Sequence, residues 1–422
     1  MKTNKLVVNL ELFGETSHSP ALVDIVGVEQ AGKVVDFCFI ANPYYPTKPM
    51  LDELVRRIPE IIKAYPSSNP RLAREQLAEV LHVKPEYLLL GNGATELITL
   101  IEKELVREIA IPIPTFSEYL EKLRTTSAAR LYQLSADNDY QLDLNDFADW
   151  IDERQISSAL IINPGNPTGQ FIALPGLKNF LARMAHLDVI LIDESFIDFS
   201  GIENPSLMPE IENYPNVIVI RSMSKHCGVP GLRLGYCCTA NAAFMKRLTD
   251  LLPIWNINTI AEVFLGMLPA TDADYQQSVV RVVDDIQAFY KGLKSVPGLK
   301  VYPTGSNFIL VKINLGMTAR DLQMHLLEAY GLYVRDCSNK IGLDQFHIRV
   351  ASQGKTADAR LLAALTEIAA NRAFETRVSS KRQASFREQP SPGLPRKRKS
   401  PARKIIPGLR NDILSKKSLR RY

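Results

Sequence analysis

Cysteine is scarce in this sequence, and its spacing indicates neither a disulfide framework nor a zinc site. The chain has 5 cysteines, an odd number, and none of them forms a Cys-X-X-Cys pair. We therefore expect reduced thiols with a structural role and no bound metal. These residues are Cys38, Cys227, Cys237, Cys238 and Cys337.

Long apolar runs are also absent. No segment approaches the roughly 18 to 20 uninterrupted apolar residues that would span a bilayer, so we expect no membrane-spanning helix. Glu11 and Glu15 fall where a signal peptide would need an apolar core. The expected location of the protein is therefore the cytoplasm.

The chain is long, and its charge is distributed unevenly. Its 422 residues exceed the roughly 150 of an average domain, so two domains are the first expectation. The formal net charge is +4, yet residues 376–422 hold 15 Lys or Arg against 2 acidic residues. An acidic body thus precedes a basic tail.

The basic tail, residues 373–422, is predicted to be disordered. Its Ser, Pro, Lys and Arg offer too little apolar surface to offset the entropy of ordering. Such a tail is usually a solvated appendage. The alternative is that it binds nucleic acid, an anionic membrane surface or an acidic partner.

Alternating strand and helix patterns organise the body of the chain. Apolar runs such as residues 159–163, 189–193 and 217–221 alternate with helical patterns, which is typical of a largely parallel sheet covered on both faces. Catalytic groups should lie at the carboxyl ends of these strands. We expect an N-terminal arm (1–40), a large α/β domain (41–255), a small α+β domain (256–372) and the tail (373–422).

The most informative segment places Lys225 just after the apolar strand 217–221. A lysine at the end of a buried strand is costly unless it is paired or chemically committed. Desolvation beside a second cation would lower the pKa of its amine and make it nucleophilic, as Schiff-base chemistry requires. Arg233 and the hydroxyls of Ser222 and Ser224 suit a phosphate. For this segment alone, the alternative is an ordinary surface loop.

Polar groups also follow the other predicted strands. Asp193 ends a wholly apolar strand, and a carboxylate there can hold a pyridine nitrogen protonated, as a pyridoxal 5′-phosphate cofactor requires. Asn166 lies in a proline- and glycine-defined loop, where its amide could bond the cofactor's phenolic oxygen. Gly93, Ala94 and Thr95 open a predicted helix, whose first amides can hold a phosphate.

Phe116 follows a further strand pattern in the segment Pro-Ile-Pro-Thr-Phe-Ser-Glu-Tyr. Its ring could stack on a flat cofactor. An aromatic side chain after a strand is, however, more often part of the core.

Together and in this order, the segments resemble the fold-type I pyridoxal phosphate enzymes of aminotransferase class I/II. The combination of Asp193 with Ser-X-Ser-Lys and the following Pro-Gly-Leu-Arg-X-Gly-Tyr carries the resemblance, which runs from about Asp36 to about Ala370. The branch it looks most like holds histidinol-phosphate aminotransferase and L-threonine-O-3-phosphate decarboxylase. The implied fold is a large domain with a mostly parallel sheet of about seven strands and a small α+β domain.

The resemblance also implies roles for the residues that match its motifs. Lys225 would carry the Schiff base, and Asp193 would pair with the pyridinium nitrogen. The remaining cofactor contacts would be Gly93, Ala94, Thr95, Ser222, Ser224 and Arg233 for the phosphate, Asn166 for O3′ and Phe116 for the ring face.

Substrate and partner residues follow from the same resemblance. Arg349 matches the arginine that grips the α-carboxylate, and Arg335 matches the one that takes a distal phosphate. Asn42 resembles the asparagine near the substrate carboxylate. Tyr65 would reach the phosphate of the neighbouring subunit's cofactor, which implies a homodimer with shared active sites.

Two departures from the family pattern bear on the reaction. Phe196 stands where most of these aminotransferases have a tyrosine that also bonds O3′, and it is closer to the phosphothreonine decarboxylase form. The decarboxylase's N-terminal His-Gly-Gly-Asn segment is missing, with only His18 near its place.

Three functions remain open at this point. We expect first an aminotransferase acting on an L-α-amino acid with a distal phosphate or phosphonate group. The second candidate is a decarboxylase of a phospho-amino acid, and the third is a binding protein whose basic tail serves nucleic acid or a partner.

Overall fold

The computed structural model describes residue 12 and residues 20–125 and 128–387. The chain divides into two compact units, Met1–Ala373 and Phe374–Tyr422. Most of the predicted basic tail, with its predicted disorder and binding role, lies outside the described residues, as does His18.

The helices and strands of the described chain have the following bounds. The helices are α1 (Leu22–Val26), α2 (Val28–Ala31), α3 (Lys48–Ile61), α4 (Arg71–Leu81), α5 (Ala94–Leu105), α6 (Glu118–Thr125), α7 (Leu144–Arg154), α8 (Leu174–Arg183), α9 (Met223–His226), α10 (Ala242–Thr249), α11 (Thr259–Met267), α12 (Asp272–Lys294), α13 (Ala319–Tyr330) and α14 (Lys355–Arg387). The strands are β1 (Val35–Asp36), β2 (Leu88–Gly91), β3 (Ile109–Ile113), β4 (Ala129–Gln133), β5 (Ser158–Ile162), β6 (Val189–Asp193), β7 (Val217–Ser222), β8 (Gly235–Cys238), β9 (Leu299–Val301), β10 (Phe308–Ile313), β11 (Leu332–Tyr333), β12 (Arg335–Asp336) and β13 (His347–Ala351).

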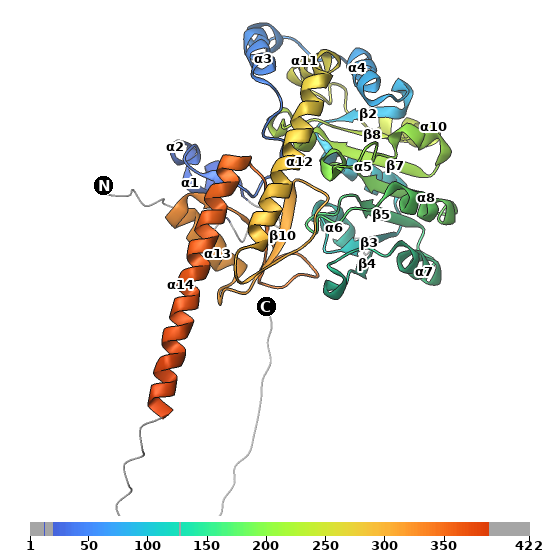
Figure 1. Ribbon diagram of the computed structural model, residues 1–422. Helices are drawn as coiled ribbons and strands as arrows, with labels where there is room; N and C mark the ends of the chain where they lie inside the picture. The colour runs from blue at the N-terminus through green and yellow to red at the C-terminus, as the bar shows by residue number, and fades with distance from the viewer. Residues whose placement is uncertain (1–11, 13–19, 126–127, 388–422) are drawn as a thin grey trace, which may run out of the picture. The chain divides into compact units, whose positions relative to one another are not determined.

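A seven-stranded sheet with the order β2-β8-β7-β6-β5-β3-β4 forms the large core (Figure 1). Its neighbours pair in parallel, except that β8 runs antiparallel to both β2 and β7. The mostly parallel sheet expected from the sequence is therefore confirmed. The carboxyl ends of β5, β6 and β7 meet at one edge of this sheet.

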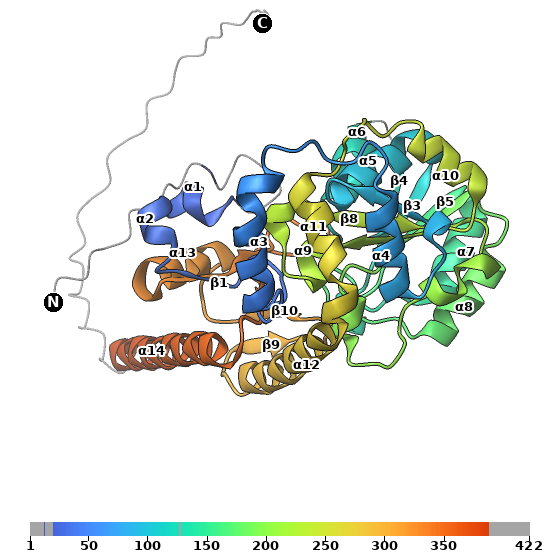
Figure 2. The ribbon, with the colours of Figure 1, turned by 90° about the horizontal axis from the view of Figure 1, so that it is seen from above.

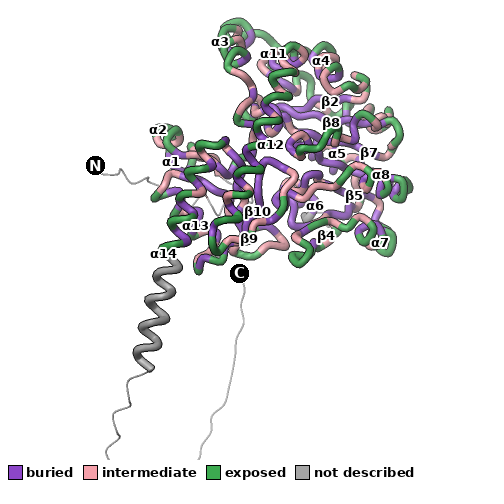
Figure 3. Tube along the Cα trace, viewed as in Figure 1, coloured by how far each residue is buried: buried purple, intermediate pink, exposed green. Residues whose placement is uncertain are grey.

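Alternate residues of each buried strand face opposite layers of helices. In β6, Ile190 and Ile192 pack in the cluster that contains residues of α4, α7, α8 and α11. Val189 and Leu191 point the other way, into the cluster with α5, α6 and α10. The two helical layers flank the sheet in Figure 2, and the central strands between them are buried in Figure 3, whereas the edge strand β4 is partly exposed. Both faces are thus covered, as the continuous apolar runs predict.

A smaller antiparallel sheet with the order β12-β13-β10-β9 forms the second core. Residues of α12, α13 and α14 pack against it, with Phe289, Leu326 and Leu365 among the fully buried side chains. This sheet and its helices are the α+β part expected from the sequence. Its strands β12 and β13 carry the two arginines that the sequence analysis assigns to substrate.

The segment expected as an N-terminal arm contains α1, α2 and β1. Strand β1 pairs in parallel with β11 through Val35 and Leu332. Ile25 and Val26 are buried in one cluster with Tyr333, so burial of apolar side chains orders a segment without a strong sequence period.

Helix α14 continues to Arg387, past residue 372, where the sequence analysis places the start of the tail. The segment from Lys355 to Arg387 contains neither proline nor glycine, so no local signal ends the helix earlier.

Two further features concern helices that could cross a membrane and the state of the cysteines. Within the described part of the chain, no helix is both long and apolar enough to cross a bilayer. The 5 cysteines are buried, and none of them forms a disulfide within the described residues.

Candidate active site

A cavity of about 280 Å³ lies where the carboxyl ends of β5, β6 and β7 meet the small sheet. Most of the predicted site residues line it. They are Ala94, Thr95, Phe116, Asn166, Asp193, Ser222, Ser224, Lys225, Arg233, Arg335 and Arg349. Segments more than 250 residues apart in the chain, between Ala94 and Arg349, therefore converge on one cavity.

Lys225 enters the cavity from α9, the single helical turn that directly follows β7. The burial of β7 on both faces fixes the start of this turn. Burial and the nearby Arg349 and Arg233 together lower the pKa of the Lys225 amine to about 8, against the opposite effect of Asp193. The unprotonated amine, which is the nucleophile, is therefore far more abundant near neutral pH than in an ordinary lysine.

Asp193, the last residue of β6, is a buried carboxylate with two protein donors. The backbone N–H of Ser195 donates to its Oδ1 at 2.9 Å, and the Tyr119 hydroxyl donates to its Oδ2 at 3.0 Å. Burial raises the pKa of Asp193, while these two bonds and the nearby Lys225 lower it. A buried carboxylate of this kind suits a protonated ring nitrogen, which would supply the missing positive partner.

The N-terminus of α5 fits a phosphate. The Gly93 backbone has φ +82°, and a Cβ there would lie 2.5 Å from Nη2 of Arg233, so the glycine leaves room for the guanidinium. No side chain caps the helix at Gly93. Ser224 is buried, and its Oγ has no hydrogen-bond partner among the described residues. Open amides, a nearby guanidinium and an unused hydroxyl are the donor set that a phosphate requires.

Arg349 on β13 connects three parts of the chain around the cavity. Its Nη1 donates to Oδ1 of Asn166 at 2.8 Å, and its Nη2 donates to the carbonyl oxygen of Cys38 at 2.6 Å. Its guanidinium also lies 5.4 Å from the centre of the Phe308 ring. The Nε of Arg349 is buried and has no partner among the described residues.

Arg335 on β12 lies directly opposite Arg349 in the antiparallel ladder of β12 and β13. Residues opposite each other in such a ladder project from the same face of the sheet. Arg335 is buried, and its Nη2 donates to Oδ1 of Asn339 at 2.9 Å. The register of two short strands thus brings both predicted substrate arginines to one wall of the cavity.

The structure does not bring Asn42 or Tyr65 into this cavity. The Nδ2 of Asn42 donates to the carbonyl oxygen of His226 at 3.1 Å and to Ser278 Oγ at 2.8 Å, and its backbone N–H donates to the carbonyl oxygen of Lys225. Asn42 therefore holds the turn that carries Lys225. Tyr65 is 80% exposed, and its ring packs at a tilt against that of Trp255.

The sequence analysis missed three residues of the site. Tyr119 supplies a donor to Asp193, and Ser195 accepts from the backbone N–H of Ser222 at 3.0 Å. Lys340 is buried, lines the cavity and donates from its Nζ to Ser117 Oγ. The signal for Ser195 was its place two residues after Asp193, whereas Lys340 lies in a loop where lysine is normally a surface residue.

Phe196 packs within the wall of the cavity. Its ring is buried and meets Phe308 edge-on, with ring centres 5.0 Å apart. Because this side chain has no hydroxyl, the position cannot donate a hydrogen bond to the cofactor.

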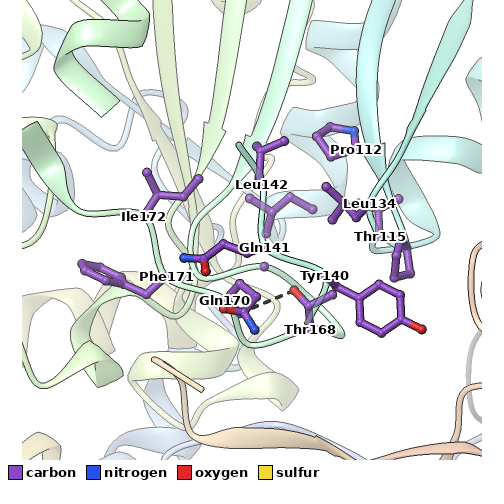
Figure 4. Close-up of a pocket in the computed structure, with 13 residues that line it drawn as sticks. Pro112, Thr115, Leu134, Tyr140, Gln141, Leu142, Thr168, Gln170, Phe171 and Ile172 are labelled. Atoms are coloured by element: carbon purple, nitrogen blue, oxygen red, sulfur yellow. Dashed lines mark hydrogen bonds between the residues drawn. The ribbon is translucent and has the colours of Figure 1, made fainter. Parts of the chain in front are cut away.

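A second, smaller cavity lies beside β3 and β5 and has a different character (Figure 4). Leu134, Leu142 and Ile172 form much of its wall, and the polar contact drawn there joins the Gln170 backbone N–H to Thr168 Oγ1 at 3.4 Å. Among the described residues that line it, none is a Lys, Arg, His, Asp or Glu. This cavity therefore lacks the charges that a phosphorylated cofactor needs.

Comparison with known proteins confirms the resemblance suggested by the motifs. The family model for aminotransferase class I and II matches residues 33–365. The L-serine phosphate decarboxylase of Sulfurospirillum multivorans is 32% identical over 369 residues, which cover 83% of this chain and 93% of that protein. The solved structure of a decarboxylase from the same organism has a TM-score of 0.75 at 31% identity and covers 83% of this chain and 92% of its own.

The histidinol-phosphate aminotransferase structure from Clostridium acetobutylicum has a TM-score of 0.73 at 27% identity, covering 80% of this chain and 100% of its own. Similarity to both decarboxylases and aminotransferases thus extends over most of the chain. With the family model matched from residue 33 to residue 365, the chain belongs to the aminotransferase class I and II family.

Proposed function

We propose that this protein decarboxylates an L-α-amino acid that carries a distal phosphate, with O-phospho-L-serine as the leading substrate. The observation that carries the proposal is the pair Arg335 and Arg349, opposite each other in one ladder and lining the same cavity as Lys225. Two fixed cations beside a nucleophilic amine suit a substrate with an anion at each end.

Pyridoxal 5′-phosphate is the cofactor of this protein. Lys225 would hold it covalently, Asp193 would keep the proton on its ring nitrogen, and the start of α5 with Arg233 and Ser224 would hold its phosphate. When bound, the cofactor accepts the electron pair of a bond to the substrate's Cα. The Nζ of Lys225 would donate and accept the proton at that carbon.

The substrate contacts are assigned from the position of each cation. Arg349, beside Asn166, would bind the α-carboxylate, and Arg335 would bind the distal phosphate. Bidentate contacts with arginine neutralise the charge of the substrate and also fix its orientation. This orientation decides which bond at Cα breaks.

The choice of reaction rests on the relatives and on Phe196. The sequence alone favours transamination, but the relative from Sulfurospirillum multivorans is named for decarboxylation of L-serine phosphate. Phe196 also matches the decarboxylase form of the motif rather than the tyrosine of most aminotransferases. Transamination remains the second candidate, because the histidinol-phosphate aminotransferase of Clostridium acetobutylicum is 27% identical over most of its length.

We also propose that the enzyme is a homodimer. An apolar face, defined by Leu51, Val55, Ile62, Tyr65 and Trp255, is exposed on the described chain. Exposed apolar patches of this kind mark interaction sites. A second copy seated here would account for the exposure of Tyr65, which the family pattern assigns to the neighbouring cofactor.

The reaction is tested by incubating the enzyme with O-phospho-L-serine, with and without 2-oxoglutarate. We expect release of one CO₂ per substrate consumed and no glutamate. Glutamate formed in step with 2-oxoglutarate loss, without CO₂, would establish transamination instead. L-Serine is the matched control, and turnover of L-serine as fast as of its phosphate would contradict the proposed substrate class.

A further inference from the structure

Lys340 is a buried cation in the cavity with no role in the family pattern described above. It lies in the loop between β12 and β13 and is 8% exposed. Its Nζ donates to Ser117 Oγ, at the start of α6 and next to Phe116. The amine therefore lies on the same side of the cavity as the residue expected to stack on the cofactor ring.

The amine of Lys340 forms no ion pair among the described residues. Arg335 and Arg349 line the same cavity and repel a further positive charge, and Glu121, which is not paired with Lys340, offsets only part of this effect. A buried cation without an ion-pair partner is costly, so this part of the cavity is suited to an anion.

We infer that Lys340 and Ser117, together with Arg335, bind the distal phosphate, and that Lys340 determines the preference for a dianionic group. The inference rests on the proposed function, and it adds a lysine and a hydroxyl to the single arginine of the family pattern. Two cations match the double charge of a phosphate monoester, whereas one arginine would serve a carboxylate equally well.

The loop that carries Lys340 is fixed from both sides. Within the loop, the Lys340 backbone N–H donates to the Cys337 carbonyl oxygen and the Leu343 N–H donates to the Lys340 carbonyl oxygen. Gly342 has φ +93°, and a Cβ there would lie 2.8 Å from the amide nitrogen of Gln133 in β4. The loop therefore packs tightly on the end of the large sheet, which holds Lys340 in place before ligand arrives.

The protonation of Lys340 should be coupled to phosphate binding. Burial, Arg335 and Arg349 together lower the pKa of its amine to about 7, while Cys337 and Glu121 act in the opposite direction. Without a bound anion the amine thus loses its proton as pH rises through about 7. A dianion stabilises the charged form, so binding above pH 7 takes up a proton.

Ligand affinity should consequently depend on pH in two directions. Below about pH 6 the phosphate itself becomes a monoanion. Above about pH 7 Lys340 must take up a proton when the ligand binds, and the free energy of this protonation weakens the measured affinity. Affinity for a phosphorylated ligand should therefore be highest between about pH 6 and about pH 7. Affinity for its unphosphorylated analogue should not decrease above about pH 7.

The test measures binding to the holoenzyme by calorimetry with 3-phosphonopropionate, which has both anions but no amine, and with propionate as the analogue. Lys340→Met should weaken binding of the phosphonate about 10- to 100-fold, as expected for loss of a charge-assisted bond. Propionate binding should stay unchanged. Lys340→Arg should restore most of the loss, and Lys291→Met, an exposed lysine of α12, should have no effect.

Proton uptake gives an independent readout. At pH 8, titrations of the wild type in buffers of different ionisation enthalpy should reveal protons taken up with the phosphonate, and Lys340→Met should take up fewer. Its melting temperature should equal or exceed that of the wild type, because a buried unpaired cation has been removed. Unchanged phosphonate affinity and proton uptake in Lys340→Met would overturn this inference alone. If the wild type itself does not prefer the phosphonate to propionate, the proposed substrate class fails as well.

Discussion

Lys225 is an amine whose charged surroundings oppose its protonation. Burial and two guanidinium groups, those of Arg349 and Arg233, lower its pKa to about 8, although Asp193 and Cys38 act the other way. A lysine whose folded pKa lies below its usual value is neutral above that pKa. The nucleophilic form is therefore available at physiological pH without a separate base.

This environment predicts how cofactor capture depends on pH. In cofactor-free protein, the rate of reaction with pyridoxal 5′-phosphate should rise with pH and level off above about 8, as Lys225 loses its proton. Arg349→Leu removes a cation that lowers the pKa, so the midpoint should move to higher pH. The measurement is the absorbance of the lysine-bound cofactor, with Lys291→Met as the control. A midpoint that stays in place in Arg349→Leu would show that burial alone sets the pKa.

Individual site residues differed in how far the sequence could predict them. Lys225 and Asp193 were predictable because Asp193 ends an apolar strand and Lys225 lies just after one, where an unpaired charge would be costly. Tyr119 and Lys340 were not, since their roles depend on contacts with residues far along the chain, Asp193 and Ser117. Tyr119 also falls at an apolar position of its helix, where an aromatic residue needs no functional explanation.

At the scale of elements, the start of α5 has no room for an added Cβ atom at Gly93. Gly93→Ala would introduce a Cβ at φ +82° and 2.5 Å from the Arg233 guanidinium, which would have to move. We expect the affinity for pyridoxal 5′-phosphate to fall at least about 10-fold, because a charge-assisted phosphate contact is displaced. The measurement is a fluorescence titration of cofactor-free protein.

Gly32→Ala provides the matched control for this change. Gly32 has φ −65°, and a Cβ there meets nothing within 4 Å. Its cofactor affinity should equal that of the wild type. Equal affinities for the Gly93 and Gly32 variants would mean that Arg233 does not hold the phosphate.

The elements themselves were predictable where burial was continuous. The strands β5, β6 and β7 read as apolar runs because both of their faces are covered. The sequence analysis did not identify β4 or β8 as strands. Strand β4 lies at the edge of the sheet and is partly exposed, with Arg130 as its second residue, and β8 begins with glycine and has four residues.

At the scale of the whole molecule, the exposed apolar face predicts assembly. Val55 is 67% exposed in the middle of α3, and the rings of Tyr65 and Trp255 pack at a tilt with their centres 4.8 Å apart. If the protein is the proposed dimer, Val55→Asp should convert it to a monomer in light scattering, because the variant places a charge in a surface that must lose water. Cofactor affinity should fall in the same variant if Tyr65 reaches the neighbouring site.

The control for assembly is Val280→Asp on α12, where the valine is 60% exposed outside the apolar face. This variant should remain dimeric with unchanged cofactor affinity. A wild type that is monomeric at micromolar concentration would contradict the proposed dimer. A Val55→Asp variant that stays dimeric would show that the interface lies elsewhere.

The two hydrogen bonds of Arg349 have a consequence for how the protein responds to its substrate. The oxygen atoms of Asn166 and Cys38 accept hydrogen bonds from the two terminal nitrogens of this guanidinium, and its Nε has no partner among the described residues. A carboxylate bound to Arg349 would therefore compete with a neutral acceptor for at least one terminal nitrogen, and a charged acceptor forms the stronger hydrogen bond. Binding of a carboxylate would thus weaken the contact of β13 with the loop of Asn166 or with the segment of Cys38.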